Sequence, residues 1–147
     1  MPDRRPVTIL LAEDDEGHSR LIEKNLRRAN ITNDILKVSD GQQAIDFLFS
    51  QGEYAGRKFP SPLLILLDLN MPVLDGRQVL ERMKADERTR RIPVIILTTT
   101  EDGREVQKCY DLGCNIFITK PVDYDQFTEA VRKIGLFISI VQIPDAG

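Results

Sequence analysis

Five short apolar runs recur along the chain, and each of them predicts a β-strand. They occupy residues 7–12, 34–38, 63–67, 93–97 and 115–119. The first and third runs lack the alternation of apolar and polar residues that marks a strand with one face in water. Near-continuous apolar strands are typical of a parallel sheet covered on both faces. We therefore expect a buried parallel sheet.

Segments with the spacing of amphipathic helices separate these runs. In the first segment Leu21, Ile22 and Leu26 share one side, and Glu23 and Arg27 lie on the other. The apolar positions of the later segments are Ala44, Ile45, Leu48 and Phe49; Val79, Leu80 and Met83; Val106, Cys109 and Tyr110; and Phe127, Val131 and Ile134. The last helix begins near Tyr124, and residues 51–62 form a long polar connection. Buried strands joined by helical crossovers predict a single domain of the α/β class.

Composition and charge narrow the possible partners. The chain has 147 residues and a formal net charge of −3, which gives no electrostatic attraction to nucleic acid or to an anionic membrane. The N-terminus lacks the apolar segment of a signal peptide, and no apolar run is long enough to span a membrane. We expect neither a nucleic-acid nor a membrane partner, and a cytoplasmic location.

The residues that follow the strands are the candidates for chemistry, because open parallel sheets bind ligands beyond the carboxyl ends of their strands. These residues are Glu13, Asp14 and Asp15 after the first strand, Asp68 after the third, Thr98, Thr99 and Thr100 at the end of the fourth, and Lys120 with Pro121 after the fifth. Acids, hydroxyls and one ammonium group are thus predicted to gather at one edge of the sheet.

This set of groups favours phosphoryl transfer with a metal ion. Crowded carboxylates repel one another unless a cation joins them, and Mg²⁺ prefers hard oxygen ligands. Lys120 and a threonine hydroxyl can donate to phosphoryl oxygens, and Asp68 is the candidate nucleophile. Taken singly, Asp14 or Asp15 could be a helix N-cap, Lys120 a surface lysine and Thr98 a local hydrogen-bond donor. Asp68 is harder to explain in this way, because burying an unpaired charge is costly.

Four stretches of the chain resemble the receiver domains of two-component response regulators. They are residues 9–15, residues 67–72 followed by Asp75 and Gly76, residues 93–98 and residues 117–121. The resemblance extends over residues 7–134. It implies a flavodoxin-like, doubly wound (βα)5 fold with a five-stranded parallel sheet in the order 2-1-3-4-5. It also implies a signalling phosphoacceptor that catalyses its own phosphorylation and dephosphorylation, and not an enzyme that acts on other substrates.

The resemblance implies a role for each matching residue. Asp68 would receive the phosphoryl group from a sensor histidine kinase, and Lys120 would pair with that group. Asp14 would bind Mg²⁺ directly, and Glu13 would act through water or at longer reach. Asp68 and the backbone carbonyl of Asn70 would complete the protein's ligands. Thr98 would move toward the phosphoryl group together with Phe117. Glu13 and Phe117 depart from the aspartate and tyrosine common in the family, and Thr99 and Thr100 add bulk that could alter access to the phosphoryl group.

The resemblance also suggests features beyond the site. A cis peptide bond before Pro121 would fix Lys120. Residues 1–134 would form the receiver domain, with no separate output domain. The apolar extension 135–147 would dock on its own domain or, as we expect, contribute to a homodimer. The long connection and this extension are similar to regulators paired with bacterial phytochrome-type kinases, while the downstream protein is unknown.

Three alternatives are weighed against this interpretation. A haloacid-dehalogenase-type phosphatase would need a second aspartate where the chain has Asn70. A flavin-binding module would need a phosphate-binding loop after the first strand, where acidic residues would repel phosphate. A degenerate receiver that only binds partners is disfavoured by the intact set of Asp14, Asp68, Thr98 and Lys120. His18 is interpreted as a solvated helix residue.

Overall fold

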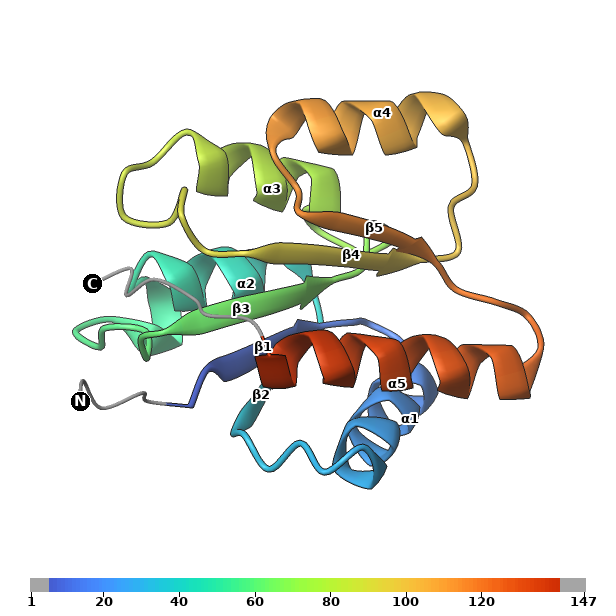
Figure 1. Ribbon diagram of the computed structural model, residues 1–147. Helices are drawn as coiled ribbons and strands as arrows, with labels where there is room; N and C mark the ends of the chain where they lie inside the picture. The colour runs from blue at the N-terminus through green and yellow to red at the C-terminus, as the bar shows by residue number, and fades with distance from the viewer. Residues whose placement is uncertain (1–5, 141–147) are drawn as a thin grey trace.

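The computed structural model describes residues 6–140, which form one five-stranded parallel sheet between two layers of helices (Figure 1). The strands are β1 (Thr8–Ala12), β2 (Ile35–Val38), β3 (Leu63–Leu67), β4 (Val94–Thr98) and β5 (Ile116–Thr119). Their order is β2-β1-β3-β4-β5, and every pairing is parallel. The α/β class, the strand order and the five predicted strands are thus confirmed.

The helices divide between the two faces of the sheet. They are α1 (Glu16–Arg28), α2 (Gly41–Leu48), α3 (Gly76–Lys84), α4 (Gly103–Leu112) and α5 (Tyr124–Ile140), with a short 3₁₀ helix η1 (Gly52–Tyr54) in the long connection. Figure 1 shows α1 and α5 on one face and α2, α3 and α4 on the other. No helix between residues 6 and 140 is long and apolar enough to cross a membrane.

Two apolar cores fill the space between the sheet and its helices. Strands β1, β3 and β4 contribute side chains to both cores, as their near-continuous apolar sequences predict. The inward positions predicted for α3 and α5 are buried: Val79, Leu80 and Met83 on α3, and Phe127, Val131 and Ile134 on α5. This burial fixes the strand ends from which the functional side chains project.

Helix α5 is longer than its predicted apolar face indicates. It continues from Ile134 through Ile140, because Ile138 extends the buried stripe by one more turn. At Gly135 the helix lies so close to α1 that an added Cβ would be 3.1 Å from Cβ of Ala29. The boundary predicted after residue 134 therefore falls inside a continuous helix, and residues 141–147 of the predicted extension lie outside the described residues.

Aspartates begin all five α-helices. Asp15, Asp40, Asp75, Asp102 and Asp123 each accept a backbone N–H hydrogen bond at the N-terminus of the helix that follows. Asp15 is thus the N-cap of α1, which was one of the alternatives for the acids after the first strand. Glu13 and Asp14 precede the cap, and Oε2 of Glu13 accepts a hydrogen bond from the backbone N–H of Asp15 at 3.1 Å.

Replacing Gly76 by alanine is expected to destabilise the domain. An added Cβ would lie 2.2 Å from the main-chain oxygen of Asp68, so α3 or the end of β3 would have to move. The expected loss is about 1–3 kcal/mol of unfolding free energy, which is typical of overpacking. Gly103→Ala is the matched control, because nothing lies within 4 Å of its added Cβ. That variant is expected to be as stable as the wild type, or more stable by up to about 1 kcal/mol. Urea unfolding with equal midpoints for both variants would contradict the packing argument.

Candidate functional site

Three carboxylates meet at the carboxyl edge of the sheet. Glu13 and Asp14 follow β1, Asp68 follows β3, and one oxygen from each lies within 4.8 Å of the others. Glu13 and Asp68 are buried, whereas Asp14 is exposed. Among residues 6–140 this is the group of acids, histidines or cysteines that is arranged to hold a metal ion. Hard oxygen donors open to solvent on one side fit Mg²⁺, which keeps several of its waters.

Lys120 joins two of these carboxylates from the end of β5. Its buried ammonium forms ion pairs with Glu13 and with Asp68 Oδ2, the latter at 3.2 Å. Its backbone N–H donates to the carbonyl oxygen of Thr98 at 2.6 Å. The cis peptide bond expected before Pro121 is absent, and the one cis bond among the described residues precedes Pro62. Lys120 is therefore held by its ion pairs and by the adjacent strand.

Asp68 is also bound through its second carboxylate oxygen. Oδ1 accepts hydrogen bonds from the Thr98 hydroxyl at 2.7 Å and from the Asn70 backbone N–H at 3.0 Å. The side-chain amide of Asn70 in turn lies 3.2 Å from the hydroxyl oxygens of Thr98 and Thr99. These contacts fix the carboxylate in one orientation. The structure thus brings Asp68, Thr98 and Lys120 together, as the strand ends predict, and places Asn70 beside them.

Phe117 lies farther from the carboxylates than these residues do. Its half-buried ring packs against the core on the side of α3 and α4. Its backbone N–H donates to the hydroxyl oxygen of Tyr110 at 3.0 Å, which ties the edge strand β5 to α4. The coupled movement of Thr98 and Phe117 stays a prediction.

Burial changes the acidity of Glu13. Removal from water raises the pKa of this carboxyl from 4.5 to about 7, although the hydrogen bond from Lys120 opposes the change. The negative charge of Asp68 raises the pKa of Glu13 further. Near neutral pH this site therefore exchanges a proton, and a bound cation would favour the ionised form.

Mg²⁺ binding is expected to strengthen as the pH rises through about 7. Below that value Glu13 must release a proton when the metal binds, so the apparent Kd rises about tenfold for each pH unit of acidification. Without metal, stability changes in the opposite direction. Native Glu13 keeps its proton up to about pH 7, whereas the unfolded chain releases it near 4.5, so the unfolding free energy falls across this window as the pH rises. Calorimetric titration and urea unfolding measure the two effects, and Glu13→Gln should remove both. A pH-independent Kd would contradict this account.

His18 is a part of the site that the sequence analysis placed in solvent. Its Nδ1 lies 3.1 Å from Nζ of Lys120, and its ring centroid lies 5.9 Å from that of Phe127. One feature of the sequence could have predicted this placement. His18 lies in the first turn of α1, where helical side chains point back toward the N-terminus and hence toward the end of β1.

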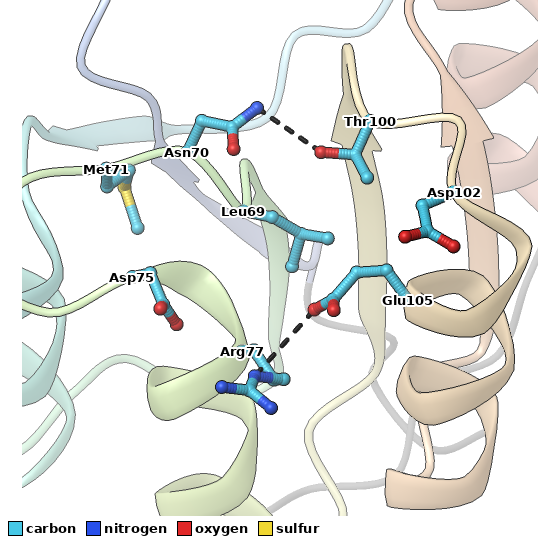
Figure 2. A pocket seen from close by; sticks show the side chains of 8 residues that line it. All are labelled: Leu69, Asn70, Met71, Asp75, Arg77, Thr100, Asp102 and Glu105. Carbon is cyan, nitrogen blue, oxygen red and sulfur yellow. Dashed lines mark hydrogen bonds and ion pairs between the residues drawn. The ribbon is translucent and has the colours of Figure 1, made fainter.

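A pocket of about 420 Å³ opens beside the site, between the ends of β3 and β4 (Figure 2). Its lining residues are Leu69, Asn70, Met71, Asp75, Arg77, Thr100, Asp102 and Glu105. Figure 2 shows the ion pair that crosses it, from Arg77 on α3 to Glu105 on α4, with an N–O distance of 3.7 Å. No pattern along the chain predicts this ion pair. Asn70 and Thr100 connect the pocket to the carboxylate cluster, and Asp68 itself lies outside the lining.

Comparison with known proteins agrees with this geometry. The model of the response regulator receiver domain family matches residues 9–132. Response regulator Rcp1 from Synechocystis sp. is 39% identical over 142 residues, which cover 96% of this chain and 95% of Rcp1. The crystal structure of the Mn²⁺-bound form of Rcp1 superposes with a TM-score of 0.88 at 37% identity and covers 95% of this chain and 99% of that one.

Two further crystal structures are similar over nearly their whole length. The response regulator receiver domain from Rhodospirillum rubrum is 51% identical, with a TM-score of 0.88 and coverage of 95% of this chain and 98% of that one. The phosphorylated cyanobacterial phytochrome response regulator RcpA is 37% identical, with a TM-score of 0.87 and coverage of 95% and 99%. Together with the acidic site at the edge of the parallel sheet, these matches show that the chain belongs to the family of response-regulator receiver domains.

Proposed function

We propose that this receiver domain takes a phosphoryl group onto Asp68 in a Mg²⁺-dependent reaction that its own residues catalyse. The observation that carries the proposal is the environment of Asp68, whose two carboxylate oxygens are bound by Thr98 on one side and Lys120 on the other. Two more carboxylates, from Glu13 and Asp14, lie within metal-binding reach. A buried carboxylate with this set of neighbours is arranged for attack on phosphorus.

The chain's own groups orient the reaction. A carboxylate oxygen of Asp68 forms a bond to phosphorus as the bond from phosphorus to the donor's histidine nitrogen breaks, and the released imidazole takes up a proton. Bound Mg²⁺ would supply charge neutralisation for the carboxylates and for the phosphoryl oxygens. Asp14, Glu13, Asp68 and the carbonyl of Asn70 would hold it. Lys120 and Thr98, already in contact with Asp68, would donate to phosphoryl oxygens. Attack by water on the same phosphorus would break its bond to the Asp68 oxygen, which regenerates the carboxylate and releases inorganic phosphate.

The partner that donates the phosphoryl group is a sensor histidine kinase, as for receiver domains in general. We infer a phytochrome-type kinase, supported by the similarity to the cyanobacterial phytochrome response regulator RcpA. We also propose a cytoplasmic location for this exchange, because such kinases take their phosphoryl group from ATP. The signal would be a shift in the equilibrium between two conformations of Thr98 and Phe117 that alters the face formed by α4, β5 and α5.

We also propose that the domain forms a homodimer through the end of α5 and the residues that follow it. The support is the exposure of apolar side chains there, with Leu136 at 49% and Ile140 at 78%. Light scattering on the wild type and on Leu136→Glu tests this idea. A wild type with the mass of a monomer would contradict it.

Chemical trapping tests the phosphoacceptor directly. The full chain is incubated with acetyl phosphate, with and without Mg²⁺, and then treated with borohydride, which reduces an acyl phosphate to an alcohol. Peptide mass spectrometry is expected to locate the reduced residue at position 68, only in the sample that contained Mg²⁺. Reduction at another aspartate, or none with any phosphodonor, would overturn the assignment.

A further inference from the structure

The ammonium of Lys120 has three hydrogen-bond partners, and one of them is not a carboxylate. The group has three N–H donors and can accept none. Within hydrogen-bonding distance lie Glu13 Oε1, Asp68 Oδ2 at 3.2 Å and His18 Nδ1 at 3.1 Å. Three donors therefore face three acceptors. This match requires Nδ1 of His18 to carry a lone pair and its ring proton to sit on Nε2.

The imidazole is held from two helices. The backbone N–H of His18 donates to Oδ1 of Asp15 at 2.9 Å, which fixes the first turn of α1. The ring lies against Phe127 of α5 at an interplanar angle of 31°. The other charged group that faces Nδ1 is Oδ2 of Asp15, at 4.0 Å. The side chain of His18 is 40% exposed, whereas that of Lys120 is 3% exposed, so His18 covers the ammonium on its solvent side.

We propose that His18 is a positioning residue for phosphoryl transfer, which holds Lys120 toward the mouth of the site and releases it to the phosphoryl group. Asp68 is an anionic acceptor, and Glu13 becomes one as it ionises around pH 7. Hydrogen bonds to ionised acceptors are roughly twice as strong as those between neutral groups. The bond to the neutral imidazole is therefore the one that an incoming phosphoryl oxygen displaces. The proposal rests on the proposed role of Lys120 at Asp68.

Without His18 the ammonium of Lys120 would lose one of its three hydrogen-bond partners. With only Glu13 and Asp68 as partners, the ammonium has a less well defined position relative to the phosphoryl oxygens. Catalysis by positioning is sensitive to displacements of this kind. His18 thus acts through Lys120 and needs no contact with the phosphoryl group.

Three substitutions separate this role from a structural one. His18→Leu removes the acceptor, and the rate constant for labelling by acetyl phosphate is expected to fall about tenfold, as for a lost hydrogen bond to a charged group. His18→Asn places an amide oxygen near the position of Nδ1 and is expected to restore the rate to within about twofold of the wild type. His18→Gln, whose amide reaches the position of Nε2, is expected to stay slow. Equal rates for the wild type and His18→Leu, or failure of Asn to restore a slow rate, would overturn the proposal.

Nitrogen NMR of the imidazole provides a readout that does not depend on the reaction. The chain contains one histidine, so untagged protein gives a single set of imidazole signals. The wild type is expected to show the Nε2–H tautomer, and Lys120→Met is expected to lose this preference, whereas Lys37→Met keeps it. Beryllofluoride, a phosphoryl mimic, is expected to shift the Nδ1 signal as Lys120 is released. A tautomer unaffected by Lys120→Met, or an Nδ1 signal unmoved when beryllofluoride is bound, would overturn the proposal. A wild type that is not labelled by acetyl phosphate would refute the proposed function instead.

Discussion

The Asp68→Asn protein is expected to take up no phosphoryl group from acetyl phosphate at any Mg²⁺ concentration. The amide is not a nucleophile toward phosphorus. The variant also lacks the negative charge of Asp68, which with that of Glu13 pairs with Lys120 and would bind the metal. Its side-chain oxygen can still accept from Thr98 and from the Asn70 backbone, so the fold of the site is kept. Intact mass spectrometry measures the adduct. Complete loss of the adduct is the largest effect that the geometry of the site predicts for the replacement of one carboxylate oxygen by an amide nitrogen.

Asp75→Asn is the matched control for this experiment. Asp75 lies in the same connection between β3 and α3 and caps the helix by accepting from the backbone of Gln78. Asparagine caps helices about as well as aspartate, so stability and labelling are expected to match the wild type. An adduct on Asp68→Asn would show that another residue accepts the phosphoryl group. Loss of the adduct in both variants would point to disruption of the connection.

Lys120→Met is expected to reduce the unfolding free energy by about 3–5 kcal/mol at pH 8 in the absence of Mg²⁺. The substitution leaves Glu13 and Asp68 buried without the cation that joins them. At pH 8 Glu13 of the wild type is ionised, because this is above its pKa of about 7. Lys120 lowers that pKa, so without Lys120 the charge on Glu13 is more costly. The loss should shrink as the pH falls and Glu13 takes up a proton. Added Mg²⁺ should recover part of the loss, because it offers the carboxylates another counter-charge.

Lys37→Met tests whether this loss comes from burial. Lys37 and Glu23 form an ion pair at 2.8 Å, with side chains 38% and 35% exposed. Exposed pairs of this type contribute at most about 1 kcal/mol, so the control should be nearly as stable as the wild type and insensitive to Mg²⁺. Urea unfolding of both variants over a range of pH provides the comparison. Similar losses in the two variants would contradict the importance of the buried charge cluster.

The parts of the fold and the site that could be predicted share one physical basis. Apolar runs such as residues 63–67 leave few places for a strand except the centre of a parallel sheet. Once the strands are parallel, their carboxyl ends share one edge, which brings Asp68 and Lys120 together despite their separation along the chain. The charge of Asp68 at the end of a wholly apolar strand therefore indicates a functional site from the sequence alone.

Other features depend on distances that periodicity does not fix. His18 is a lone polar residue in the first turn of α1, which is typical of a solvated position. Only the packing of α1 against α5 brings its ring to Lys120. The ion pair between Arg77 and Glu105 depends on the spacing of α3 and α4. The extension of α5 to Ile140 was missed because the sequence there is apolar on more than one side.

The close backbone contacts described for Gly76 have a mechanical consequence. A Cβ at Gly76 would touch the main chain of Asp68, and one at Gly41 would lie 1.9 Å from the main-chain oxygen of Leu74. The starts of α2 and α3 therefore pack backbone against backbone on the connection between β3 and α3, which leaves them little room to move. On the other side, α4 begins at Gly103, where nothing lies within 4 Å of an added Cβ, and its side chains join it to α3 through the Arg77–Glu105 ion pair and to β5 through the Tyr110 hydroxyl. Backbone contact is thus closest on the side of α2 and α3, so we expect a displacement that begins at Asp68 to travel toward α4 and β5.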